Sequence, residues 1–214
     1  MSDTFSLDRE RGALFDAAGC RFDPRTRTWV STAGATATGG SVDAIAAVTW
    51  LQREAGHPVR IPVGVIGPRD APASQLAAAE AVGRGLAQMG FAVVCGGRQG
   101  VMEAVCRGAA GAGGTTIGIL PDADPAPANP HVGVIIATGI GEARNALIAR
   151  AALCLVAIGD SYGTLSEVAL GRQFGKRVIG LEGAARVDGV VHVATVAEAL
   201  SEVALVALGV PGAA

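Results

Sequence analysis

From residue 61 onward, apolar runs alternate with amphipathic stretches. Short and almost unbroken apolar runs occupy residues 62–67, 91–97, 115–121, 131–138, 153–159, 176–183 and 190–195. Stretches with an apolar position every three or four residues occupy 74–90, 100–113, 141–152, 164–175 and 196–208. Unbroken apolar runs are typical of strands covered on both faces, and the second spacing is typical of helices. The pattern therefore predicts an α/β fold: a Rossmann-like, doubly wound and mainly parallel sheet with helices on both faces.

The first 60 residues do not follow this alternation. Their residue types predict, in order, a short strand ending at Trp29-Val30, a small-residue loop over 31–40 and a helix over about 42–54. Ser41 precedes that helix and has the side chain of an N-cap residue. We therefore predict two parts: an N-terminal extension over 1–60, and a main domain over 61–210 on which it packs.

Composition and charge restrict the class of protein and of partner. Half of the 214 residues are hydrophobic, which is enough to form a sizeable core. The formal net charge of -2 favours neither nucleic acid nor an anionic membrane as a partner. Glycine or charge breaks every apolar run before the ~18 residues of a membrane-spanning helix, and the N-terminus has no apolar signal segment. Four cysteines without a CxxC pair indicate a reduced, cytoplasmic protein.

Histidines are scattered along the chain. His57, His131 and His192 share no metal-ligand spacing. We therefore expect no metal site and no bound cofactor.

Glycine-rich turns follow several predicted strands, and ligands of open parallel sheets bind outside the carboxyl ends of the strands. Gly67 follows the first strand. Gly96, Gly97 and Gly100 follow the second, and Met102 lies on the helix that begins there. Glycines let the backbone approach a ligand, and the free N–H groups of a helix start attract an anion. A tight turn without a ligand is the open alternative for this second segment.

Another junction of strand and helix lies at Gly159–Glu167. The amides of Tyr162–Leu165 are predicted to be free and to point at a bound phosphate. Glu167 is predicted to lie in the first helical turn, where it either faces the ligand or ties back to Thr164 in a capping box. The spacing Thr164-x-x-Glu167 by itself favours the capping box.

Arg144 is predicted to lie in the first turn of the helix over 141–152. A cation there opposes the helix dipole, so it is unfavourable unless an acid or an anionic ligand compensates it. This mild misfit favours a role in binding, and an ordinary surface arginine is the alternative.

Three motifs occur in a characteristic order: Gly-Gly-x-x-Gly-Val-Met over 96–102, Ala-Arg-Asn over 143–145 and Gly-Thr-x-x-Glu over 163–167. Together they resemble the Lonely Guy (LOG) family, once described as lysine decarboxylases, over about residues 61–183. The resemblance implies a nucleotide-binding domain and a homodimer or higher homo-oligomer. It also implies a phosphoribohydrolase that cleaves the N-glycosidic bond of AMP or of cytokinin riboside monophosphates.

The resemblance assigns roles to individual residues. Arg144 and Glu167 match the catalytic pair, and Glu167 would stabilise the positive charge that bond cleavage builds on the sugar. The residues of the motifs and strand ends expected to bind the ligand and its phosphate are Gly67, Gly96, Gly97, Gly100, Met102, Asn145, Asp160, Ser161, Tyr162, Gly163 and Thr164.

Some positions depart from the family's pattern. Asn145 stands where the family has Lys, Glu142 where it has His, and Asp160-Ser161 where it has Gly-Gly. A carboxylate at Asp160 would repel a phosphate unless it points away or binds a metal.

The Ala-Arg-Asn and Gly-Thr-Leu-Ser-Glu motifs more closely resemble a bacterial branch that is similar to molybdenum cofactor carrier proteins. This second resemblance implies a non-catalytic binder of a nucleotide or of a phosphorylated pterin as the alternative to the enzyme. A structural or partner-binding role with a vestigial site is the third interpretation.

Overall fold

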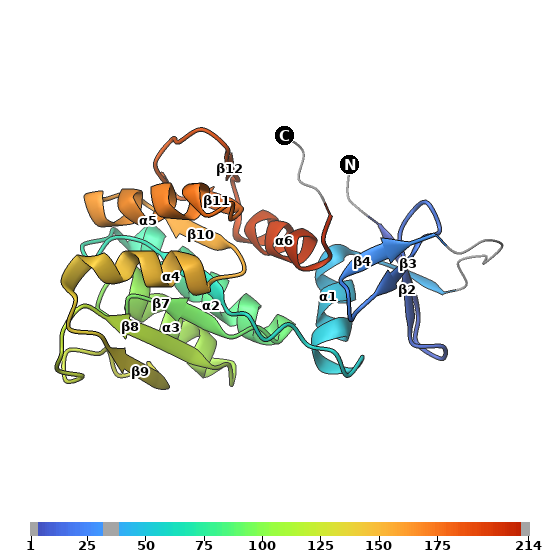
Figure 1. Ribbon diagram of the computed structural model, residues 1–214, viewed down its shortest axis with the longest axis horizontal. Helices are drawn as coiled ribbons and strands as arrows, with labels where there is room; N and C mark the ends of the chain where they lie inside the picture. Colours follow the sequence, from blue (N-terminus) through green and yellow to red (C-terminus); the bar gives the residue numbers. More distant parts are fainter. Residues whose placement is uncertain (1–3, 32–38, 211–214) are drawn as a thin grey trace.

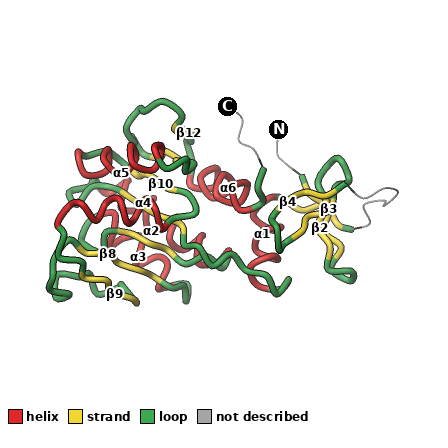
Figure 2. Tube along the Cα trace, viewed as in Figure 1, coloured by secondary structure: helices red, strands yellow, loops and turns green. Residues whose placement is uncertain are grey.

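The computed structural model describes residues 4–31 and 39–210, so most of the loop predicted over 31–40 lies outside the described residues. Within them, seven parallel strands form one sheet in the order β12-β11-β10-β6-β7-β8-β9 (Figures 1 and 2). They are β6 (Val63–Ile66), β7 (Val93–Cys95), β8 (Thr116–Leu120), β9 (Val134–Ala137), β10 (Leu155–Ile158), β11 (Val178–Leu181) and β12 (Val190–His192). Each lies inside one of the predicted apolar runs.

Helices cover both faces of this sheet. They are α2 (Ala73–Met89), α3 (Val101–Gly111), α4 (Asn145–Ala151), α5 (Tyr162–Gln173) and α6 (Val196–Ala207), whereas α1 (Ala44–Arg53) packs against α2 and α6. Helices α1, α2, α3 and α6 share one apolar cluster with the sheet, whereas α4 and α5 join a second cluster formed by other side chains of the same strands. The predicted doubly wound α/β fold is therefore confirmed.

The stretch over 141–152 is not one helix. A 3₁₀ helix, η1 (Gly141–Arg144), precedes α4, which begins at Asn145. Arg144 therefore lies at the junction of the two helices, not in the first turn of a long one.

A second, antiparallel sheet lies in the N-terminal segment, to the right in Figure 1. Its order is β4-β3-β2-β1-β5, and its strands are β1 (Phe5–Asp8), β2 (Ala13–Phe15), β3 (Arg21–Asp23), β4 (Thr28–Val30) and β5 (Gly40–Val42). The sequence predicts only β4 among them. Strands of three or four residues are too short to establish an alternating pattern, so the other four were missed.

The N-cap predicted for the helix after this sheet is wrong. Helix α1 begins at Ala44, and the side chain of Asp43 accepts a hydrogen bond from the Ala46 amide at 2.7 Å. Ser41 lies in β5 and pairs with Ser6 of β1. Both residue types are good caps, and strand pairing with β1 decides which one is used.

The N-terminal segment contacts the rest of the chain through α1 and β4. Helix α1 packs against α2 and α6 in the larger apolar cluster. Trp29 stacks on Phe5, with ring centroids 5.6 Å apart, and its indole N–H donates to the Leu208 carbonyl at 3.0 Å. The boundary at residue 60 between two domains stays a prediction.

In the described part of the chain, no helix is long and apolar enough to cross a membrane.

Candidate functional site

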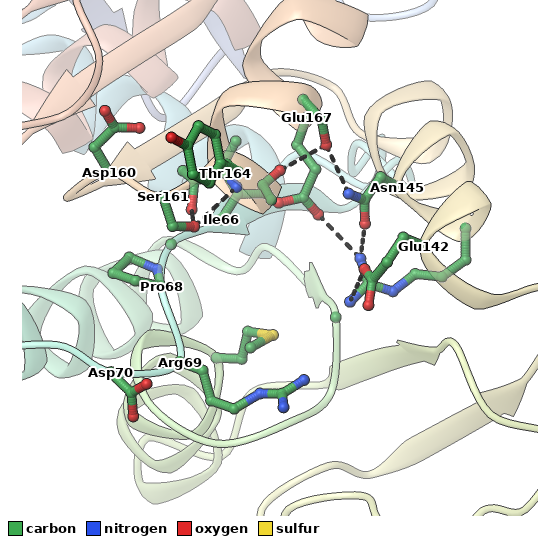
Figure 3. Close-up of a pocket in the computed structure, with 17 residues that line it drawn as sticks. Ile66, Pro68, Arg69, Asp70, Glu142, Asn145, Asp160, Ser161, Thr164 and Glu167 are labelled. Atoms are coloured by element: carbon green, nitrogen blue, oxygen red, sulfur yellow. Dashed lines mark hydrogen bonds and ion pairs between the residues drawn. The ribbon is translucent and has the colours of Figure 1, made fainter.

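The strand order places a crevice between β6 and β10. From β6 the chain proceeds outward through β7, β8 and β9, and then returns to β10 on the other side of β6. Ligands of doubly wound sheets bind outside the carboxyl ends of the strands at such a reversal. A cavity of about 640 Å³ lies there, lined by the segments that follow β6, β7 and β10 and by the junction of η1 and α4 (Figure 3).

Most of the predicted site residues line this cavity. They are Arg144, Glu167, Gly67, Gly96, Met102, Asn145, Asp160, Ser161, Tyr162, Gly163 and Thr164. Four segments far apart in the sequence are thus brought together at one edge of the sheet.

Gly97 and Gly100 do not line the cavity, so the structure does not bring these two residues together with the other predicted site residues. Both have a left-handed backbone, with φ of 71° in each case. A Cβ on Gly100 would lie 2.1 Å from the Arg69 carbonyl oxygen, and one on Gly97 would lie 3.0 Å from the Gly118 Cα. These two glycines form the turn after β7, which is the alternative that the sequence left open.

Six further residues line the cavity and were not predicted as ligand contacts: Ile66, Pro68, Arg69, Asp70, Glu142 and Ser166. The signal for Pro68 and Arg69 was their position directly after the first predicted strand, where only Gly67 was assigned. Glu142 was noted solely as a departure from the family's pattern.

Ser161 caps helix α5. Its Oγ accepts a hydrogen bond from the Thr164 amide at 3.2 Å and lies 2.9 Å from the Thr164 Oγ1. The Leu165 amide donates to the Ser161 carbonyl at 2.8 Å. The N-cap of α5 therefore lies three residues before the predicted cap at Thr164, and the capping box of Thr164 with Glu167 is wrong.

This cap changes the number of amides that can face a ligand. Of the four predicted free amides, those of Thr164 and Leu165 already donate within the turn. Among the described residues, the amides of Tyr162 and Gly163 have no acceptor. Two N–H groups at a helix N-terminus, near its positive dipole end, remain available for an anion.

Arg144 is buried, with 5% of its surface exposed. Its Nη1 lies 3.5 Å from Glu167 Oε1, and its Nη2 lies 3.8 Å from Glu142 Oε2. It also donates to the Asn145 side-chain oxygen (Figure 3). Two acidic side chains therefore lie beside this cation at the junction of η1 and α4, where a helix start favours negative charge.

Asn145 links this arginine to the start of α5. Its amide nitrogen donates to the Ser166 Oγ at 2.7 Å, and that hydroxyl donates to the Gly163 carbonyl at 2.7 Å. The hydrogen-bond chain fixes the Arg144 side chain relative to the turn that carries the free amides. Asparagine can do this because it both accepts from Arg144 and donates to Ser166, whereas lysine only donates.

Glu167 lies in the second turn of α5 and has 6% of its surface exposed. Burial raises its pKa to about 8, although Arg144 opposes the shift, and Glu142 adds to it. At neutral pH the side chain is therefore mostly protonated. In that form it can donate a hydrogen bond as well as accept one.

Asp160 is exposed at the start of this turn. Figure 3 shows its carboxylate turned away from Glu167. The repulsion between Asp160 and a phosphate stays a prediction.

Comparisons with known proteins agree with this architecture. The model of the SLOG cluster4 family matches residues 60–207. An uncharacterized protein of Archaeoglobus fulgidus is 36% identical over 127 residues, which cover 59% of this chain and 83% of that protein.

Two solved structures are similar at the level of both sequence and fold. The molybdenum cofactor binding protein of Rippkaea orientalis is 33% identical with a TM-score of 0.64, over 68% of this chain and 96% of that one. The molybdenum cofactor carrier protein of Chlamydomonas reinhardtii is 35% identical with a TM-score of 0.64, over 69% of this chain and 98% of that one. The resemblance to the carrier-like branch, drawn from the motifs, is confirmed.

DNA processing protein A of Streptococcus pneumoniae is 19% identical with a TM-score of 0.54, over 66% of this chain and 61% of that one. This likeness extends to the fold alone.

Proposed function

This chain belongs to the SLOG cluster4 family, and on that premise we propose that it binds a small phosphorylated heterocycle, a nucleotide or a pterin phosphate, between β6 and β10. The observation that carries the proposal is the convergence of a helix N-terminus with two free amides and a buried arginine on one cavity. Its volume of about 640 Å³ is within the range of small-molecule sites. Two of the similar solved structures are a molybdenum cofactor binding protein and a molybdenum cofactor carrier protein, and this likeness supports a pterin phosphate as one of the two ligands.

The protonation of Glu167 favours binding without catalysis at neutral pH. A phosphoribohydrolase needs an ionised carboxylate beside the sugar, because positive charge develops there in the transition state. With a pKa of about 8, Glu167 is mostly neutral and offers a hydrogen-bond donor instead. We therefore propose a carrier or a sensor as the function.

A phosphoribohydrolase is the second candidate, and one observation favours it. Arg144 and Glu167, the two residues that match the LOG catalytic pair, lie 3.5 Å apart in the wall of the cavity. A higher pH would leave an ionised Glu167 beside the sugar.

Ligand binding and hydrolysis can be separated in one experiment. Wild type and Glu167→Gln are incubated with AMP, other nucleoside monophosphates and a pterin phosphate, at pH 7 and at pH 9. Melting temperature and release of ribose 5-phosphate are measured. We expect a ligand of one class to raise the melting temperature of both proteins, with no ribose 5-phosphate at pH 7.

Each other outcome has a definite meaning. Release by wild type and not by the Gln variant, at either pH, would make the hydrolase the correct function. If no phosphorylated ligand changes the melting temperature of wild type and none is hydrolysed, the proposal is wrong.

A phosphate at the start of α5 needs a cation that is free to pair with it. Two arginines line the cavity, and Arg144 already contacts Glu167 and Asn145. Arg69, from the loop after β6, is exposed and forms no ion pair with any described residue (Figure 3). Arg69 is therefore proposed as the cation that pairs with the ligand's phosphate.

Substitution of Arg69 should weaken binding of phosphorylated ligands selectively. Arg69→Ala is expected to raise the Kd for AMP, or for the phosphorylated ligand that binds best, by about tenfold or more, since hydrogen bonds to charged groups contribute about 1.5–3 kcal/mol. The Kd for the matching compound without phosphate should stay within twofold. Titration calorimetry measures both.

Arg84→Ala is the matched control, because it removes an exposed arginine of α2 that pairs with Glu80 instead of lining the cavity. An equal loss of affinity for ligands with and without phosphate would exclude Arg69 as the phosphate's partner.

The cytoplasmic location and the homo-oligomer stay predictions. Localisation in cells tests the first, and sedimentation of the purified protein tests the second.

A further inference from the structure

Basic side chains gather at a second place, between the β3–β4 hairpin and the segment 56–61 that leads to β6. Two adjoining cavities of about 410 and 400 Å³ lie there and share Pro24, Arg25 and His57. Arg21 lines the first cavity, and Arg27 and Arg60 line the second. We call the pair of cavities the basic groove.

The arginines of the basic groove lack the partners that other arginines have. Elsewhere in the described chain, the arginines that form ion pairs with Asp or Glu are Arg9, Arg11, Arg84, Arg98, Arg107, Arg144 and Arg177. None of the four arginines of the groove forms such a pair within the described residues. Positive charge is thus concentrated where, among the described residues, no carboxylate forms an ion pair with it.

Asp23 is the one acidic residue that lines either cavity, and its carboxylate is already engaged. It accepts the Arg25 amide at 2.9 Å, and hydrogen bonds within its own turn, that amide first, lower its pKa. Four guanidinium groups therefore face one carboxylate, which serves to hold the hairpin turn.

Arg27 is held in the groove at a cost. It has a left-handed backbone, with φ of 58°, and its amide donates to the Asp23 carbonyl at 2.7 Å. Its side chain is half-buried, and this burial lowers its pKa. A strained, partly desolvated cation without a carboxylate is favourable when an anionic ligand compensates it.

The shape of the groove limits the kind of anion. Each cavity is within the size range of small-molecule sites. Val30 and Ile61, 47% and 49% exposed, provide apolar surface in the first and second cavity respectively. A single-stranded nucleic acid usually needs a longer basic track with aromatic side chains on which bases stack, and no Phe, Tyr or Trp other than the buried Phe22 lines either cavity.

We propose that the basic groove is a second binding site, for a small, multiply phosphorylated anion. It lies almost entirely outside the residues 60–207 that the family model matches, so the cavity between β6 and β10 and the family relationship do not account for it. The proposal does not depend on the function proposed for that other cavity.

The test uses the full chain and tripolyphosphate as the probe. The Kd is measured by calorimetry at about 0.15 M salt. Arg25→Ala/Arg60→Ala removes two exposed guanidinium groups from the groove. Arg84→Ala/Arg107→Ala removes two from the Glu80 ion pairs and is the charge-matched control. We expect wild type and control to bind alike and the groove variant to bind at least tenfold more weakly.

The substituted side chains are exposed, so the variants are expected to fold. Thermal unfolding of all proteins verifies this. Arg69→Ala is measured in parallel, because Arg69 lines the cavity between β6 and β10 and this variant shows whether the probe binds in that cavity. A loss of tripolyphosphate binding in Arg69→Ala alone would place the probe in the cavity between β6 and β10 and overturn the proposal.

Further ligands distinguish the class of anion. A nucleoside triphosphate should bind at least as tightly as tripolyphosphate, and inorganic phosphate more weakly. A single-stranded oligonucleotide that binds tenfold more tightly than either, with the gain lost in Arg25→Ala/Arg60→Ala, would assign the groove to nucleic acid and overturn the small-anion site. Absence of tripolyphosphate binding to wild type, or an equal loss in the charge-matched control, would also overturn it.

Discussion

Alanine at Gly83 or at Gly108 should lower the free energy of unfolding by about 3 kcal/mol or more. These glycines lie where α2 and α3 cross. A Cβ on Gly83 would lie 2.1 Å from the Val105 carbonyl oxygen, and one on Gly108 would lie 2.0 Å from the Glu80 carbonyl oxygen. Both obstacles are backbone atoms, so a side-chain rotation cannot relieve either clash. The two helices must move apart and lose contacts across a closely packed interface.

Helix propensity acts in the opposite direction and is too small to compensate. An alanine in a helix is about 1 kcal/mol more favourable than a glycine. Gly111 is the matched control, because it belongs to α3 and a Cβ there would meet nothing within 4 Å. Gly111→Ala should be neutral or stabilise the protein slightly.

Urea unfolding of the three variants checks this prediction. Midpoints for Gly83→Ala and Gly108→Ala that equal the midpoint for Gly111→Ala would contradict the close crossing of α2 and α3. The two destabilising substitutions face each other across one interface, so their effects should not add in the double variant.

Glu167→Gln should remove a pH dependence of stability that wild type has. Folding raises the pKa of Glu167 from its ordinary value of 4.5 to about 8. Between about pH 4.5 and pH 8, the native protein therefore holds a proton at Glu167 that the unfolded chain has already lost. Stability from this group is present below about pH 4.5 and is lost as pH rises toward 8, at a rate of about 1 kcal/mol per pH unit.

Free energies of unfolding for both proteins between pH 5 and pH 9 measure this effect. Wild type should lose stability relative to the Gln variant from pH 5 to about 8, and the difference should then level off. Glu142→Gln is the control, because the Glu142 side chain is 71% exposed. Removing its charge lowers the pKa of Glu167, but the stability of this variant should still fall with rising pH at nearly the same slope as that of wild type.

Parallel curves for wild type and Glu167→Gln would mean that Glu167 is ionised throughout. In that case the carboxylate needed beside the sugar is present at neutral pH, and the phosphoribohydrolase becomes the favoured function. The stability measurement and the assay of ribose 5-phosphate therefore test the same residue through independent properties.

The residue types alone predict the elements of the main domain and the segments that form its cavity. Each strand from β6 to β12 lies within an apolar run, and each helix from α2 to α6 overlaps an amphipathic stretch, because burial on one face or on both imposes a period that neighbouring residues display. The turn after β10 and the Ala-Arg-Asn segment were likewise recognised from residues that are close together in the chain. The three-residue strands of the N-terminal sheet have no such period, and they were missed.

Which residues contact each other, and whether Glu167 carries a proton, depends on the tertiary structure. The placement of β6 beside β10 brings Arg69 to the same cavity as Ser161, although more than 90 residues of sequence separate them. The start of α5 at Tyr162 makes Ser161 the cap and leaves Glu167 free to face Arg144. The burial of Glu167 then raises its pKa, although Arg144 opposes the shift. Strand order, helix starts and desolvation all depend on packing between distant segments, and a local pattern of residue types cannot contain that information.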